Sequence, residues 1–110
     1  KEKNDKLIIL NSPEKFTLKI ITKTKPEQNT KLMWLYKSNW LYCTQCESEG
    51  FRRITYYLDR PDVLTKFSVK ITADKTKNPI LLSNWNKIDF WDLEWNRHFA
   101  VWEDPFAKPC

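Results

Sequence analysis

Short stretches in which apolar and polar residues alternate recur along the chain and predict β-strands. The two regular ones are residues 16–20, with Phe16, Leu18 and Ile20 on one face, and residues 67–72. Successive side chains of a strand point to opposite faces, so each stretch can bury its apolar face while the other meets water. Both stretches are therefore predicted to be strands.

Further segments are predicted to be extended because apolar residues gather between turn-forming ones. Turn residues at 37–39 join residues 32–36 to residues 41–43. Residues 83–86 are expected to join residues 79–82 to residues 87–93 as a hairpin, although Trp85 stands where such a turn favours glycine. These segments are residues 7–10, 32–36, 41–43, 79–82, 87–93 and 97–102.

Helical periodicity is not sustained over 12 or more residues anywhere in the chain, and only a helical turn is expected, around residues 50–57. The fold class is therefore predicted to be mainly β, built of antiparallel sheets. At 110 residues, with 41% hydrophobic and 30% charged residues, the chain is expected to form a single soluble domain over residues 1–110. Its abrupt beginning and end are interpreted as cuts from a longer protein.

Charge gives little indication of a polyanionic partner. The net charge of +5 arises from 19 basic and 14 acidic residues that are spread along the chain rather than gathered in a stripe. No apolar run approaches the roughly 20 residues of a membrane span. We therefore expect neither nucleic acid nor a membrane as a partner.

The three cysteines leave several interpretations open. Cys43 and Cys46 are spaced C-x-x-C, which fits a redox motif, half of a zinc site, or no special role. A zinc site would need two further ligands, and only His98 and Cys110 remain. Reduced thiols in a cytosolic setting are the favoured interpretation.

Residues 43–64 form the most distinctive run, because acids, an amide, arginines and the only glycine, Gly50, are gathered there without repetition. Together with other segments, this run resembles the bacterial aminopeptidase N family in order and spacing, over nearly the whole chain. The matching segments are residues 16–21, 43–64, 73–75, 81–84, 97–98, 102–106 and 108–110.

The resemblance implies a saddle-like amino-terminal β domain with a β-sandwich of antiparallel sheets, which packs on the catalytic domain of a larger, cytoplasmic aminopeptidase. It matches Glu47 to the carboxylate that binds the α-ammonium of the peptide substrate, and Gln45 to the amide that lines the pocket for the first side chain. An exopeptidase must distinguish a free amino terminus from an internal peptide bond, and a carboxylate that is withdrawn from water does so.

Two motifs of that family are missing from these residues: the zinc-binding H-E-x-x-H and the G-A-M-E-N segment that binds the peptide backbone. The resemblance thus implies zinc in the parent enzyme and none bound by this fragment. No catalytic residue is assigned, and the fragment is predicted to be inactive alone. The charged residues Arg52, Arg53, Asp59, Arg60 and Asp62 are expected to form local ion pairs.

Tryptophan replaces glycine in several of the matching turns. Ordinary glycine usage of about 7% would give roughly eight in 110 residues, yet the chain has one. Our hypothesis is that the gene uses UGA as a glycine codon and that the printed sequence reads it as tryptophan; the alternative is a tryptophan-rich relative. The positions are Trp34, Trp40, Trp85, Trp91 and Trp95, whereas Trp102 matches a family tryptophan.

A different function class remains open beside the enzyme fragment. A stand-alone basic, aromatic-rich β module could bind single-stranded nucleic acid or carbohydrate by stacking on exposed tryptophans. The reading frame beyond Cys110 discriminates between the two, since only the enzyme requires H-E-x-x-H there.

Overall fold

A computed structural model describes residues 2–3 and 6–110. The chain divides into two compact units, Lys1–Arg60 and Pro61–Cys110. Each unit is described by itself. A single domain over residues 1–110 stays a prediction.

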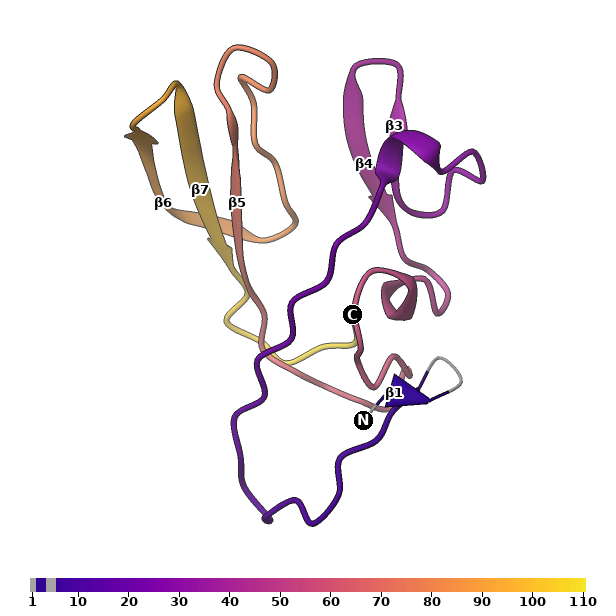
Figure 1. The fold of residues 1–110 in the computed structure, drawn as a ribbon. Helices are drawn as coiled ribbons and strands as arrows, with labels where there is room; N and C mark the ends of the chain where they lie inside the picture. The colour runs from indigo at the N-terminus through magenta and orange to yellow at the C-terminus, as the bar shows by residue number, and fades with distance from the viewer. Residues whose placement is uncertain (1, 4–5) are drawn as a thin grey trace. The chain divides into compact units, whose positions relative to one another are not determined.

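The first unit contains two small antiparallel pairings. Strands β1 (Glu2–Lys3) and β2 (Lys6–Leu7) pair over two residues each. Strands β3 (Trp34–Ser38) and β4 (Leu41–Gln45) form a hairpin whose two-residue turn is Asn39-Trp40 (Figure 1). The predicted extended segments are confirmed for residues 34–36 and 41–43, whereas Leu32 has a left-handed φ of 54° and lies outside the strand. The turn is shifted toward the carboxyl end from residues 37–39.

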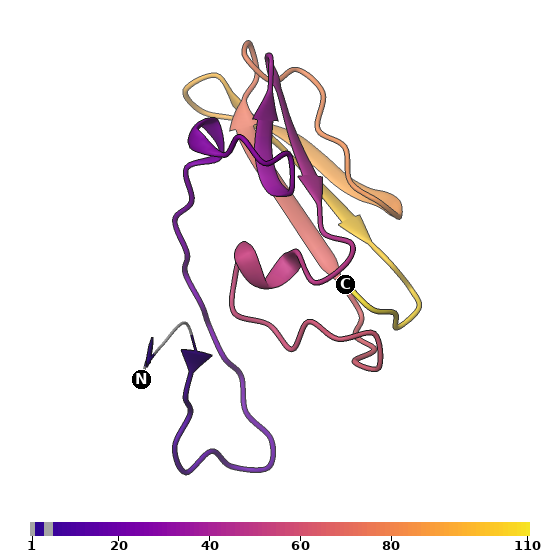
Figure 2. The ribbon, with the colours of Figure 1, turned by 90° about the vertical axis from the view of Figure 1, so that its right-hand side faces the viewer.

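Two short 3-10 helices complete the regular structure of this unit. The first, Pro26–Gln28, precedes β3, and proline at its start supplies a fixed φ. The second, Phe51–Arg53, follows β4 and is the short coil after the hairpin in Figure 2. It confirms the helical turn expected at residues 50–57.

The predicted strand at residues 16–20 is wrong. The segment has no strand assignment and pairs with no other part of the described chain, and Phe16 and Leu18 are 52% and 48% exposed. Likewise, only Leu7 of residues 7–10 belongs to a strand. Alternation marks a segment suited to a sheet, but a strand also needs a neighbour for its backbone groups, and this unit supplies none here.

The second unit is built on a three-stranded antiparallel sheet with the order β5-β7-β6 (Figure 1). β5 spans Ser68–Asp74, β6 spans Asn86–Leu93 and β7 spans Arg97–Glu103. All seven residues of β7 pair with β5 and with β6, and the register shifts between Lys87 and Asp89. The strands predicted at residues 67–72, 87–93 and 97–102 are confirmed.

The hairpin predicted around residues 83–86 is wrong. Residues 79–82 form no strand, and β6 pairs instead with β7 through the loop formed by residues 94–96. Trp85 still lies at positive φ, 82°, at the entrance to β6. The turn-forming residues at 83–86 were recognised correctly, but their strand partner lies later in the chain.

Little of the described chain is withdrawn from water. Ala100, in the middle of β7, is the only apolar residue there that is buried, at 4% exposure. Large apolar side chains such as Ile21, Leu82 and Phe106 are more than 70% exposed. The mainly β fold class with antiparallel sheets is confirmed, and the one buried apolar residue among those described lies in the second unit.

Candidate functional site

Gln45 and Glu47 lie together at the end of the β3–β4 hairpin. Gln45 is the last residue of β4, and its side-chain Nε2 donates a hydrogen bond of 3.1 Å to the backbone carbonyl of Glu47. Both side chains are exposed. Among residues 2–3 and 6–110, the Glu47 carboxylate has neither an ion-pair partner nor a hydrogen-bond donor. It is therefore available to a cation from outside the chain.

A tight turn follows directly and requires its glycine. The backbone N–H of Gly50 donates to the carbonyl of Cys46 at 2.7 Å. A Cβ atom at Gly50 would lie 2.8 Å from Cα of Cys46 and 2.9 Å from the carbonyl oxygen of Gln45. Those distances are too short for any side chain, so glycine at 50 lets the turn fold back against the end of β4.

Asp59 fastens the segment that follows the turn. This buried carboxylate, 6% exposed, accepts the backbone N–H of Arg52 at 3.0 Å and lies 3.5 Å from Nε of the same residue. The Arg52 guanidinium also lies 3.5 Å from the Glu49 carboxylate. The local ion pairing predicted for Arg52 and Asp59 is thus present, and it ties residues 49–59 into one closed loop.

The three cysteines are free thiols, and Cys43 and Cys46 belong to β4 and the turn that follows it. Cys43, Cys46 and Cys110 form no disulfide. Burial raises the pKa of the Cys46 thiol, and the nearby Asp59 carboxylate adds to the effect. At neutral pH Cys46 is therefore a protonated, weakly nucleophilic group, which does not favour a redox role.

The register of the hairpin brings one unforeseen residue to the site. Trp34 is the direct cross-strand partner of Gln45. Its φ is 53°, and the Arg53 guanidinium lies 5.9 Å from its ring centroid. The side chain at position 34 therefore shapes the surroundings of Gln45.

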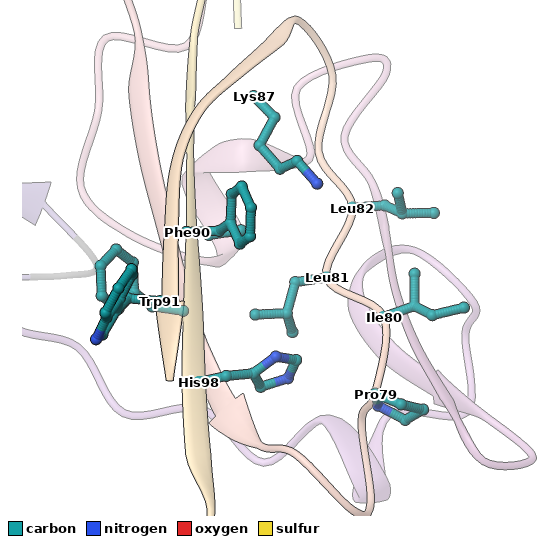
Figure 3. A pocket seen from close by; sticks show the side chains of 10 residues that line it. Pro79, Ile80, Leu81, Leu82, Lys87, Phe90, Trp91 and His98 are labelled. Carbon is teal, nitrogen blue, oxygen red and sulfur yellow. The ribbon is translucent and has the colours of Figure 1, made fainter. Parts of the chain in front are cut away.

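A separate hollow of about 310 Å³ lies in the second unit (Figure 3). Leu81, Phe90 and His98 turn toward one another there, whereas Trp91 lies on the other side of β6. His98 Nε2 donates a hydrogen bond to the carbonyl of Asn78 at 2.7 Å. With its histidine engaged on the backbone and apolar groups around it, the hollow presents no catalytic constellation.

Within the described residues, no group of three or more histidine, cysteine, aspartate or glutamate side chains could hold a metal ion. The donor set of the described residues therefore does not fit a metal centre. No helix in the described part of the chain has the length and apolar character needed to cross a membrane.

The sequence matches the Peptidase M1 N-terminal domain over residues 1–110. The chain belongs to that family. It is 58% identical over 110 residues to aminopeptidase N of Escherichia coli (strain K12), covering 100% of this chain and 13% of the relative. Aminopeptidase N of Haemophilus influenzae is 56% identical over 98 residues, covering 89% of this chain and 11% of the relative.

Aminopeptidase N of Caulobacter vibrioides is 50% identical over 105 residues, covering 96% of this chain and 12% of the relative. Among solved structures, Legionella pneumophila aminopeptidase A in complex with aspartic acid is similar with a TM-score of 0.71 and 38% identity. The match covers 74% of this chain and 10% of that one. The chain thus spans 10% to 13% of the length of these four relatives.

Membership of the M1 family confirms the resemblance inferred from the motifs, and the relatives are aminopeptidases, hence hydrolases. Sequence reasoning alone had not found the steric role of Gly50 or the pairing of Trp34 with Gln45. The single glycine in the chain was a usable signal for the first. The second depends on hairpin register, which the shifted turn had obscured.

Proposed function

We propose that this chain is part of the amino-terminal β domain of a zinc-dependent aminopeptidase and contributes to recognition of the substrate's amino terminus. Glu47 binds the α-ammonium of a peptide, and Gln45 lines the pocket for the first side chain. The chain supplies these groups to a cleft that the catalytic domain completes. Peptides with a free amino terminus are the proposed substrates, and the cytoplasm is the proposed location.

The main support is the arrangement at the end of β4. Gln45 donates its amide to the Glu47 backbone, which fixes the two residues relative to each other. The Glu47 carboxylate is left without a cation among the described residues, although Arg52 lies in the same loop and is engaged by Asp59 and Glu49. A carboxylate that its own loop leaves unpaired is suited to an ammonium ion from a ligand.

Selectivity for a free amino terminus follows from the charge. Within a cleft that excludes water, an ammonium compensates the Glu47 carboxylate, whereas the neutral amide of a blocked peptide leaves it uncompensated. Binding the terminus at a fixed point also sets how far the first peptide bond reaches into the cleft. The Legionella structure was solved with aspartic acid, a ligand with such an α-ammonium.

The remaining apolar surface supports a larger assembly. Side chains such as Ile21 at 84% exposure and Leu82 at 73% are costly to leave in water. We propose that the rest of the enzyme covers part of this surface. Zinc, which would activate the attacking water, is assigned to the catalytic domain and not to this chain.

The proposal is tested with Glu47→Gln in the intact enzyme. A charge-assisted hydrogen bond contributes about 1.5 to 3 kcal/mol, so kcat/KM for a peptide with a free amino terminus should fall roughly ten- to a hundredfold. Amino-terminally blocked peptides should bind poorly to the wild type and lose little more in the variant.

Glu49→Gln is the matched control. It removes a carboxylate from the same turn, one that contacts Arg52 and is 60% exposed. We expect it to change kcat/KM by less than about threefold, as for surface ion pairs in general. Equal losses for free and blocked peptides in Glu47→Gln would show that Glu47 only supports the fold.

A further inference from the structure

Three of the six tryptophans have a left-handed backbone conformation. The φ angles are 53° at Trp34, 82° at Trp85 and 61° at Trp95. In this region the side chain of an L-residue crowds its own backbone, and for a bulky residue it is a genuine outlier. Glycine has no Cβ and enters the region freely.

Each of the three lies where the chain changes direction. Trp34 begins β3, Trp85 immediately precedes β6, and Trp95 is the middle residue of the loop from β6 to β7. Trp95 is followed by Asn96, also at positive φ, 54°. Consecutive left-handed residues of this kind are the setting in which turns select glycine, often beside asparagine.

Composition also indicates that tryptophan stands where glycine is expected. The chain has six tryptophans and one glycine, against the roughly eight glycines that ordinary usage of about 7% would give. The one glycine present, Gly50, is required by steric contact and not by a positive φ. The positions that need left-handed freedom are therefore occupied by other residues, three of them tryptophan.

We infer that Trp34, Trp85 and Trp95 stand at positions that the source cell fills with glycine, because it decodes UGA as glycine and the printed sequence translates UGA as tryptophan. Under this inference the codon at each of the three positions is UGA. The codon at Trp102 is UGG.

Side-chain packing does not compensate for the strained conformation at Trp95, which is 87% exposed. Trp85 has one ring contact, stacking on Phe67 at 5.4 Å between centroids, and Trp34 has the Arg53 guanidinium. Trp102 differs in each respect, since it is half-buried in the central strand β7 and its φ is not positive.

The two other tryptophans at glycine-like positions have weaker support. Trp40 follows Asn39, whose φ is 54°, in the two-residue turn of the β3–β4 hairpin, where Asn-Gly is a favoured pair. Trp91 lies inside β6, and its backbone gives no reason for glycine. The backbone thus supports glycine at positions 34, 85 and 95, and we expect glycine at position 40 as well.

Peptide mass spectrometry of the protein purified from its source cells tests the inference directly. Trypsin would release residues 32–37, 78–87 and 88–97, which contain positions 34, 85 and 95, and a peptide that begins at residue 98 contains Trp102. We expect glycine encoded by UGA at positions 34, 85 and 95, and tryptophan encoded by UGG at position 102. Tryptophan at position 34, 85 or 95 of the native protein, or UGG as the codon there, would overturn the inference.

Hydrogen exchange of the intact protein supplies a second readout. Replacing Trp34, Trp85 and Trp95 together by glycine should slow exchange of the flanking strand amides by about tenfold, equivalent to about 1.4 kcal/mol. Trp102→Gly is the control and should speed exchange in β7, because it empties a packed position. Unchanged or faster exchange in the triple variant would contradict the need for glycine at these sites.

Discussion

Among the described residues, positive φ occurs at three asparagines, at three tryptophans, and at Leu32 and Glu49. Asn11, Asn39 and Asn96 belong to the residue type that tolerates the left-handed region, because its short amide can bond to the local backbone. Tryptophan has no such device, and each left-handed tryptophan costs on the order of 1–3 kcal/mol. The free energy of unfolding of a domain is typically about 5–15 kcal/mol, so three such residues would remove a large part of it.

Gly50 is the opposite case, because glycine is required there by steric contact and not by a positive φ. Gly50→Ala should destabilise the Cys46–Gly50 turn by about 1–3 kcal/mol, as overpacking does, because its Cβ would lie within 3.0 Å of backbone atoms of Gln45 and Cys46. The measurement is urea unfolding of the intact enzyme together with kcat/KM.

Because the turn positions Glu47, activity toward free amino termini should fall along with stability. Ala73→Gly, in strand β5 of the second unit, serves as the control for small-residue exchange. Full activity and an unchanged midpoint in Gly50→Ala would show that the turn relaxes without consequence.

The candidate site shows how far single residues could be interpreted from sequence. Nothing in charge or periodicity separates Glu47 from the other glutamates, and it was assigned because the surrounding run resembled a family. The unpaired carboxylate and its contact with Gln45 depend on a backbone turn that composition does not encode. Ion pairing between Arg52 and Asp59 was foreseeable, since opposite charges lie close in sequence on either side of a helical turn.

Among the elements, prediction succeeded where a strand's partner is also in the chain. β5 alternates cleanly, β7 is an apolar run between turn-forming residues, and the two pair with each other along their whole length. Residues 16–20 alternate equally well, yet they pair with nothing in the described chain. Alternation of apolar and polar residues is a property of one segment, whereas a sheet also needs a second segment to pair with. The wrong strand prediction at residues 79–82 has the same origin.

A pH dependence is expected at the end of β7. Asp104 accepts the Phe106 N–H at 2.9 Å and pairs with the Lys108 ammonium, whose interaction holds the pKa of that buried carboxyl below its ordinary value. Because the folded-state pKa is lowered, the ionised carboxyl stabilises the fold fully above the unfolded-state pKa of about 3.9. This stabilisation is lost as the pH falls from that value through the lower folded-state pKa.

Asp104→Asn should therefore lower stability at pH 7 and flatten its decline between about pH 5 and pH 3. Urea midpoints across this range would measure the effect, with Asp89→Asn on the exposed part of β6 as the comparison. An equally steep acid decline in both variants would place the titrating group elsewhere.

For the whole molecule, activity is predicted to depend on parts beyond this chain. The 110 residues contain one histidine, so the two-histidine zinc motif of the family cannot be formed from them. The purified 110-residue fragment should not cleave aminoacyl-anilide substrates, with or without added zinc. Turnover that survives repurification and is abolished by Glu47→Ala would refute this prediction.

The strand order β5-β7-β6 also governs when the second unit can form during synthesis. Its central strand is the last of the three to leave the ribosome, so β5 and β6 emerge with their backbone groups unpaired. Both remain open templates for wrong pairing until β7 arrives and closes two ladders at once. A nascent chain that has emerged from the ribosome only as far as residue 96 would thus present both strands with unpaired edges, a natural substrate for chaperones.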